Sequence, residues 1–129
     1  MLSVEQLKVH FFSDERVARA VDGVSYEVRK GETVCLVGES GCGKTVSALA
    51  IMGILPIPPG RIVGGRILFN GQNLLDLGSE EMQKVRGRRI AMIFQEPMTS
   101  LNPVFTVGDQ IGEAILVHEK PDQEELRRR

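Results

Sequence analysis

One eight-residue stretch constrains the fold of this chain more than any other: Gly38, Glu39, Ser40, Gly41, Cys42, Gly43, Lys44 and Thr45. It matches the phosphate-binding pattern G-x-x-x-x-G-K-[ST]. The glycines allow backbone angles that other residues avoid, so that consecutive N–H groups can surround a phosphate. In this pattern the lysine reaches the β- and γ-phosphates and the threonine hydroxyl holds Mg²⁺. The motif therefore predicts a nucleotide site in which Lys44 and Thr45 have these roles.

The residues on either side of the motif fit the order of strand, loop and helix that such a site requires. Residues 33–37 (Thr-Val-Cys-Leu-Val) form a short apolar run, which is typical of a buried parallel strand. Residues 46–52 are good helix formers, and Gly53 and Pro56 follow them. We therefore expect a parallel strand over 33–37, then the phosphate loop, and then a helix that ends near Gly53.

Composition and charge narrow the class of protein. The 129 residues suffice for one domain with its own core. A net charge of −1 argues against a nucleic-acid-binding surface. No apolar run is long enough to span a bilayer, and the first residues lack the pattern of a signal peptide. Cys35 and Cys42 show neither a disulfide framework nor a metal-binding spacing. These features favour a cytoplasmic protein.

Several further segments predict secondary structure. Residues 7–11 and 24–28 alternate between apolar and polar side chains, as half-exposed antiparallel strands do. Residues 66–69 predict another strand, and Asn70 with Gly71 is a strong turn signal. The sequence therefore predicts an antiparallel sheet beside the phosphate-binding core.

A second fully apolar run, residues 90–94 (Ile-Ala-Met-Ile-Phe), predicts another buried strand with Gln95 at its carboxyl end. Ligand contacts in open α/β sheets gather at the carboxyl ends of strands, which makes Gln95 a candidate site residue. A polar residue that simply closes a strand is an equally good interpretation. A loop is expected from Glu96 to Pro103.

The last third of the chain predicts helices. Thr106 and Asp109 fit a capping box for one helix, and the acids after Pro121 begin another. The sequence stops inside that second helix at Arg129. We therefore expect these 129 residues to be part of a longer protein.

Three segments of this sequence resemble the ATP-binding cassette (ABC) proteins, and in particular the ATPase subunits of oligopeptide, dipeptide and nickel importers. They are residues 20–26 (Ala-Val-Asp-Gly-Val-Ser-Tyr), 37–41 (Val-Gly-Glu-Ser-Gly) and 91–103 (Ala-Met-Ile-Phe-Gln-Glu-Pro-Met-Thr-Ser-Leu-Asn-Pro). Many NTPases share the phosphate loop, whereas the third segment is much more selective. The likeness covers essentially the whole chain.

This resemblance implies an α/β P-loop NTPase fold, here an incomplete ABC ATPase core with an N-terminal antiparallel β subdomain and the start of a helical subdomain. Residues 1–129 would form the N-terminal part of one ATP-binding domain. Within it, the antiparallel β portion would take about 1–32 and 61–71, the P-loop core about 33–55 and 79–95, and the Q-loop with the start of the helical subdomain about 95–129.

The resemblance also implies site residues. The stretch from Gly38 to Thr45 would bind the phosphates of ATP and Mg²⁺. Gln95 matches the Q-loop glutamine, which would contact Mg²⁺ or the attacking water, while its loop senses the membrane subunits. Phe11 matches the aromatic residue that stacks on adenine, with Phe12 as the alternative, and core packing is the competing interpretation for both. Cys42 stands where serine is more usual, but that position acts through its backbone N–H, so binding should survive.

The partners implied are a second ATP-binding subunit, integral membrane permease subunits and, indirectly, a solute-binding protein, with no nucleic acid. The chain would lie on the inner face of the cell membrane. The family's signature Leu-Ser-Gly-Gly-Gln, its Walker B Asp with the adjacent catalytic Glu, and its switch His do not occur in these residues and are expected beyond Arg129. The 129 residues alone are therefore expected to be inactive in ATP hydrolysis.

Two alternatives stay open at this point. One is a nucleotide-binding or interaction fragment without turnover. The other is an ABC ATPase that does not transport and works in DNA repair or chromosome structure. The sequence does not decide between peptide and nickel as the solute, or between a homodimer and a heterodimer.

Overall fold

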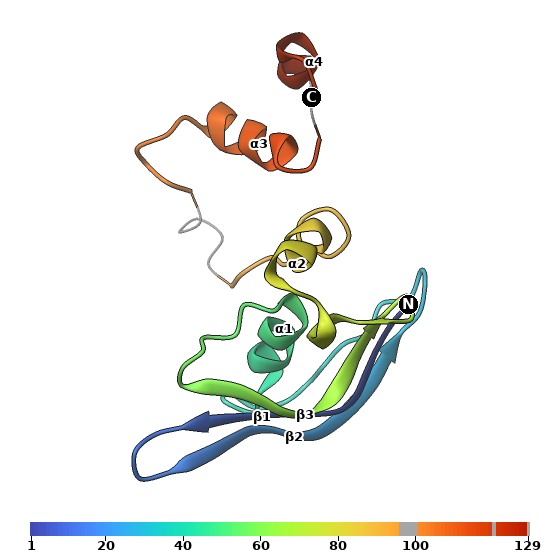
Figure 1. The fold of residues 1–129 in the computed structure, drawn as a ribbon, viewed down its shortest axis with the longest axis vertical. Helices are drawn as coiled ribbons and strands as arrows, with labels where there is room; N and C mark the ends of the chain where they lie inside the picture. Colours follow the sequence, from blue (N-terminus) through green and yellow to red (C-terminus); the bar gives the residue numbers. More distant parts are fainter. Residues whose placement is uncertain (96–100, 120, 129) are drawn as a thin grey trace. The chain divides into compact units, whose positions relative to one another are not determined.

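The computed structural model describes residues 1–95, 101–119 and 121–128. They fall into two units, residues 1–82 and 83–129. The first unit holds an antiparallel sheet and the helix that follows the phosphate loop (Figure 1). The predicted loop from Glu96 to Pro103 lies partly outside the described residues, because positions 96–100 are not among them.

Four strands form the sheet of the first unit, in the order β2–β1–β3–β4. They are β1 Leu2–Phe12, β2 Val17–Val28, β3 Gly60–Phe69 and β4 Gln72–Asn73. All three pairings are antiparallel, which confirms the strands predicted in the first third of the chain. β3 begins at Gly60 and is longer than the predicted strand 66–69.

A tight turn joins β3 to β4. Asn70 and Gly71 connect the two strands with φ angles of 50° and 86°. Positive φ at both central residues is the mark of a type I′ turn, whose twist matches that of the flanking strands. The turn predicted at Asn70 and Gly71 is therefore confirmed.

A bulge in the middle of β1 changes which of its side chains face the core. The pairing register of β1 shifts between Val4 and Leu7, and the intervening Gln6 has a φ of 48°. Gln6 donates from its backbone N–H to Ser25 Oγ at 2.8 Å, which satisfies a group that the ladder leaves unpaired. As a result Val4 and Leu7 are both buried although they are three residues apart.

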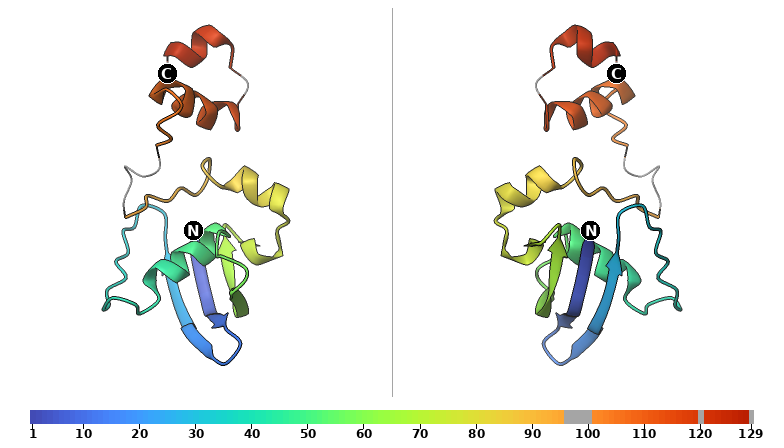
Figure 2. Two further views of the ribbon diagram at one scale, coloured as in Figure 1. Left: turned by 90° about the vertical axis from the view of Figure 1, so that its left-hand side faces the viewer. Right: turned by 90° about the vertical axis from the view of Figure 1, so that its right-hand side faces the viewer.

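Helix α1, Lys44–Met52, covers one face of this sheet (Figure 2). It ends at Gly53, whose φ is 62°. The Gly53 N–H donates to Ala50 O, and the next N–H reaches back to Leu49 O, as in a Schellman motif. The predicted helix and its end are therefore confirmed.

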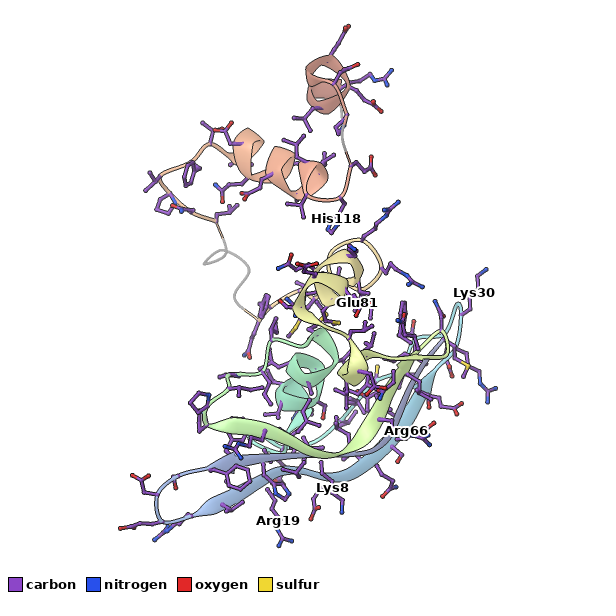
Figure 3. The ribbon with its side chains drawn as sticks, viewed as in Figure 1. Lys8, Arg19, Lys30, Arg66, Glu81 and His118 are labelled. Carbon is purple, nitrogen blue, oxygen red and sulfur yellow. The ribbon has the colours of Figure 1, made fainter. Side chains whose placement is uncertain are left out.

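The core of the first unit lies between α1 and the inner face of the sheet. Its buried apolar side chains are Val4, Leu7, Val9, Val21, Ala50, Ile51, Met52, Leu55, Ile67, Leu74 and Met82. On the opposite face of the sheet, Lys8 and Arg19 point away from α1 (Figure 3). The alternation predicted for residues 7–11 is confirmed for Leu7 and Val9, which are fully buried.

Two predicted strands are absent. Residues 33–37 and 90–94 form no strand, and Val37 and Ile93 are 93% and 89% exposed. Only Ile90 makes an isolated parallel bridge, to Arg86. A parallel strand is stable when neighbouring strands satisfy its backbone and helices cover both of its faces. Every strand of the sheet in the described residues is antiparallel, so these two segments have no such neighbours.

The remaining helices are short. A 3₁₀ turn, η1 Leu74–Asp76, follows β4, and α2 Ser79–Val85 spans the boundary between the units. The second unit contains α3 Val107–Leu116 and α4 Gln123–Arg128. No helix within the described ranges has the length and hydropathy needed to cross a bilayer.

Thr106 caps the start of α3, as predicted, but the Asp109 side chain of the predicted capping box meets the Thr106 hydroxyl and not its backbone N–H. Thr106 Oγ1 accepts a hydrogen bond from the Asp109 N–H at 3.1 Å and donates to Asp109 Oδ2 at 2.6 Å. An N-cap of this kind satisfies one of the backbone donors that a helix start leaves free. At α4 the Asp122 carboxylate accepts from the Glu125 N–H at 2.8 Å. Both helix starts are therefore where the sequence predicted them.

We predict that Val9→Ala lowers the free energy of unfolding by about 2 kcal/mol, because two buried methyl groups are lost and a small cavity remains. Val17→Ala is the matched control, since Val17 is 52% exposed, and its effect should stay below about 0.5 kcal/mol. Urea unfolding of the two variants measures the difference. Equal losses would contradict the assignment of the inner face of β1.

Candidate nucleotide site

The phosphate loop leads directly into the N-terminus of α1. Gly43 precedes the helix with a φ of 89°, and no side chain caps the helix start. The first N–H groups of α1 are therefore free of side-chain partners, at the positive end of the helix dipole. This is the arrangement in which helix N-termini bind phosphate.

Gly43 is also the point where the loop touches the sheet. A Cβ on Gly43 would collide with the backbone carbonyl oxygen of Ala20 in β2, and it would lie 3.3 Å from Val21 Cγ2. Gly41 has a similar φ of 83°, but a Cβ there would meet nothing within 4 Å. Glycine is thus required at 41 by conformation, and at 43 by conformation and by close packing on β2.

Lys44 curls back over the loop. Its ammonium donates to Gly38 O at 2.6 Å, to Glu39 O at 2.7 Å and to Cys42 Sγ at 3.2 Å. An ammonium has three donors, and all three find partners inside the loop. The loop therefore holds one positive charge at its centre, and both carbonyl partners belong to its first two residues.

Ser47 anchors the first turn of α1 from within. It is buried, and its hydroxyl donates to Gly43 O at 3.1 Å, alongside the backbone bond from Ser47 N–H to the same oxygen at 2.9 Å. Sequence reasoning missed this residue, because a serine inside a run of helix formers gives no sign of its partner.

The other loop residues face solvent. Glu39, Ser40, Gly41, Cys42 and Thr45 are all exposed. No cluster of three or more His, Cys, Asp or Glu side chains suited to a metal ion occurs in the part of the chain that the structure describes. Mg²⁺ is usually held by one or two side chains together with substrate phosphates and water. The exposed hydroxyl of Thr45 beside the loop fits such a site.

Phe11 lies close to the loop in the sheet. It pairs with Ala18 of β2, two residues along the strand from Ala20, which the loop contacts. Phe11 is half-buried. Successive side chains of a strand point to opposite faces, so Phe11 shares the face of Leu7 and Val9.

Phe12 points to the other face and already has partners there. The Arg61 guanidinium lies 5.5 Å from the centre of its ring, within the range of a cation–π interaction. The His10 ring lies 6.3 Å away, centroid to centroid. The fallback residue for adenine stacking is therefore engaged on the outer face of the sheet.

Gln95 is exposed and belongs to the second unit. Its role beside the phosphate loop is a prediction from the sequence. The same applies to the domain boundaries implied by the resemblance.

The glycine-rich loop leads into helix α1, and α1 packs on one face of the sheet. This arrangement defines the chain as a P-loop protein. The family model described as ABC transporter matches residues 21–129. The chain belongs to the ABC transporter family.

Curated relatives align with nearly the whole chain. The probable peptide ABC transporter ATP-binding protein y4tR of Sinorhizobium fredii is 53% identical over 118 residues, covering 92% of this chain and 35% of that protein. The dipeptide transport ATP-binding protein DppD of Escherichia coli is 50% identical over 129 residues, covering 100% of this chain and 39% of that protein. The chain thus spans little more than a third of the length of these relatives.

Solved structures give the same fold. A dimeric ATP-binding cassette in a post-hydrolysis state bound to ADP and Pi matches with a TM-score of 0.81 at 24% identity. The match covers 99% of this chain and 53% of that one. At this level of identity the likeness concerns the fold, and it confirms the predicted α/β P-loop class.

We predict that Gly43→Ala destabilises the protein more than Gly41→Ala does. Alanine at either position adopts a left-handed conformation at a cost of about 1–2 kcal/mol. At position 43 the methyl group also collides with the Ala20 carbonyl, which adds about 1–3 kcal/mol. Denaturant unfolding measures both variants, and equal stabilities would contradict the close packing of the loop on β2.

We also predict that Lys44→Ala weakens MgATP binding about 10- to 100-fold, because a charge-assisted phosphate contact is lost. Lys84→Ala removes an exposed charge from α2 and serves as the control. Calorimetric titration gives both affinities. If the Lys44 variant binds MgATP with unchanged affinity, Lys44 is not part of the nucleotide site.

Proposed function

We propose that this chain is part of the ATP-binding subunit of an ABC importer for peptides, which couples ATP binding and hydrolysis to transport. The single observation that carries this is the phosphate loop, built as described above, in a chain about 50% identical to peptide and dipeptide transport ATP-binding proteins. Nickel is the other solute that the sequence left open. The names of these relatives favour a peptide.

ATP and Mg²⁺ fit the residues of the loop. The free N–H groups at the start of α1 would bind the β-phosphate, since they lie at the positive end of the helix. Lys44 would exchange carbonyl partners for phosphate oxygens, and charge-assisted bonds of this kind are about twice as strong as neutral ones. Thr45 would hold Mg²⁺, which neutralises charge that develops on the phosphates when it is bound.

For adenine, the sheet favours Phe11 over Phe12. Phe11 lies opposite Ala18, near the loop, while the Phe12 ring is occupied by Arg61 on the other face. Gln95 would contact Mg²⁺ or the attacking water, as the match to the Q-loop glutamine of the family implies. The remaining catalytic groups of the family do not occur in these 129 residues.

The proposed partners are a second ATP-binding subunit and integral membrane permease subunits, with a solute-binding protein acting through the permease. The dimeric state of the similar solved cassette supports the first of these. We place the protein at the cytoplasmic face of the membrane, bound to the permease.

The test is ATP-driven uptake of a dipeptide and of nickel by the complete subunit, reconstituted with its permease in lipid vesicles. We expect dipeptide uptake that Lys44→Ala abolishes, because the charge-assisted phosphate contact is lost. The control Lys84→Ala removes an exposed charge from α2 and should preserve uptake within about twofold. Nickel uptake without dipeptide uptake would show that the transported solute is nickel and not a peptide. ATP binding without uptake of either, in an intact complex, would contradict the proposal.

A further inference from the structure

Ser47 holds the carbonyl group of the residue at which α1 begins. It is 4% exposed, and its hydroxyl donates to Gly43 O at 3.1 Å. The Ser47 N–H donates to the same oxygen at 2.9 Å, which is the first backbone bond of the helix. The Gly43 carbonyl therefore accepts two hydrogen bonds from one buried residue, and its direction is fixed from inside the helix.

The direction of this carbonyl determines the direction of the next N–H group. Gly43 and Lys44 are joined by a trans peptide bond, in which C=O and N–H lie in one plane and point in opposite directions. Because Gly43 O points into the helix toward Ser47, the Lys44 N–H points out of the N-terminal end. A phosphate bound at a helix start lies on that side. Ser47 thus controls, through one peptide plane, a donor that faces the phosphate loop.

The start of α1 has no cap that would do this from outside. Gly43 stands at the N-cap, and glycine rotates more freely than any other residue. Serine, threonine or aspartate at an N-cap would accept hydrogen bonds from the N–H groups of the first turn, and would so occupy donors that a phosphate needs. The Ser47 hydroxyl stabilises the same turn from the carbonyl side. It uses none of the N–H groups of residues 44–46.

The sheet fixes Gly43 in a different way. A Cβ on Gly43 would collide with the Ala20 carbonyl oxygen, so that the loop is pressed on β2 at this point. This contact limits where the Gly43 Cα lies. Rotation about the Cα–C bond would still turn the carbonyl without moving Cα, and the two hydrogen bonds from Ser47 oppose that rotation.

We propose that Ser47 is a positioning residue for nucleotide binding, which fixes the Gly43–Lys44 peptide so that the Lys44 N–H is aimed at the β-phosphate. The hydroxyl acts through the Gly43 carbonyl and does not touch the nucleotide. A second donor on that carbonyl also polarises the peptide, which makes its N–H a stronger donor. This inference rests on the nucleotide site of the proposed function and is independent of the transported solute.

A buried serine inside a helix often bonds the carbonyl four residues earlier without any part in binding, so the test separates the two roles. It compares three variants of the complete subunit. Ser47→Ala removes the hydroxyl and keeps a good helix former. Ser47→Thr keeps a hydroxyl that can reach the same carbonyl. Ile51→Val is the matched control, since Ile51 is buried on the same face of α1, one turn later.

We expect Ser47→Ala to bind MgADP about five- to tenfold more weakly than the wild type, in line with the loss of one hydrogen bond. Ser47→Thr and Ile51→Val should stay within about twofold of the wild type, because both keep a hydroxyl for Gly43 O. Calorimetric titration gives the affinities, and urea unfolding shows that each variant is folded.

The kinetics of ATP hydrolysis by the complete transporter give a second readout. For Ser47→Ala we expect KM to rise by the same factor as the dissociation constant, with kcat within about twofold of the wild type. The reason is that the Lys44 N–H would bind the phosphate alike before and during the reaction.

Equal MgADP affinities of Ser47→Ala and the wild type would overturn this inference. A folded Ser47→Thr variant that binds as weakly as Ser47→Ala would overturn it as well, because the hydroxyl would not be the cause. If Ile51→Val loses as much affinity, or if Ser47→Ala does not fold, Ser47 serves helix stability alone. Should Ser47→Thr not fold, Ser47→Ala and Ile51→Val decide. A wild type that does not bind MgADP contradicts the proposed function itself.

Discussion

The contact between Gly43 and the backbone of β2 is the constraint on which the site depends. The missing side chain lets the loop approach the Ala20 carbonyl, and the left-handed conformation of Gly43 then turns the chain into α1. The same residue offers its carbonyl oxygen to Ser47, which fixes the first helical turn. Loop, helix and sheet thus meet at one position where any other residue would hold them apart.

This contact determines where the other residues of the candidate site lie. Because the loop is fixed on β2, the free N–H groups of α1 and the Lys44 ammonium gather at one end of the helix. The antiparallel pairing of β1 with β2 then brings Phe11 to the same neighbourhood, opposite Ala18. The start of a helix, a positive charge and an aromatic ring therefore lie near the point where Gly43 contacts β2.

The sequence was sufficient where the signal is local. The phosphate loop, the helix that ends at Gly53, the Asn70–Gly71 turn and the Thr106 cap each follow from residues adjacent in the chain. It was insufficient where stability comes from distant partners. The apolar runs 33–37 and 90–94 have strand composition, but they remain exposed because a parallel strand depends on neighbours that the described residues do not supply. Ser47 was missed for a related reason, since its partner is the Gly43 carbonyl oxygen and a backbone partner has no signature in side-chain composition.

An amide-resolved NMR titration of the protein with MgADP tests most directly whether the loop before α1 binds the nucleotide. We expect the largest shifts on the N–H groups of residues 41–46, at the loop and the first turn of α1. They should saturate together with a single dissociation constant. Saturable binding without shifts in that segment would place the nucleotide elsewhere and contradict a nucleotide site at this loop.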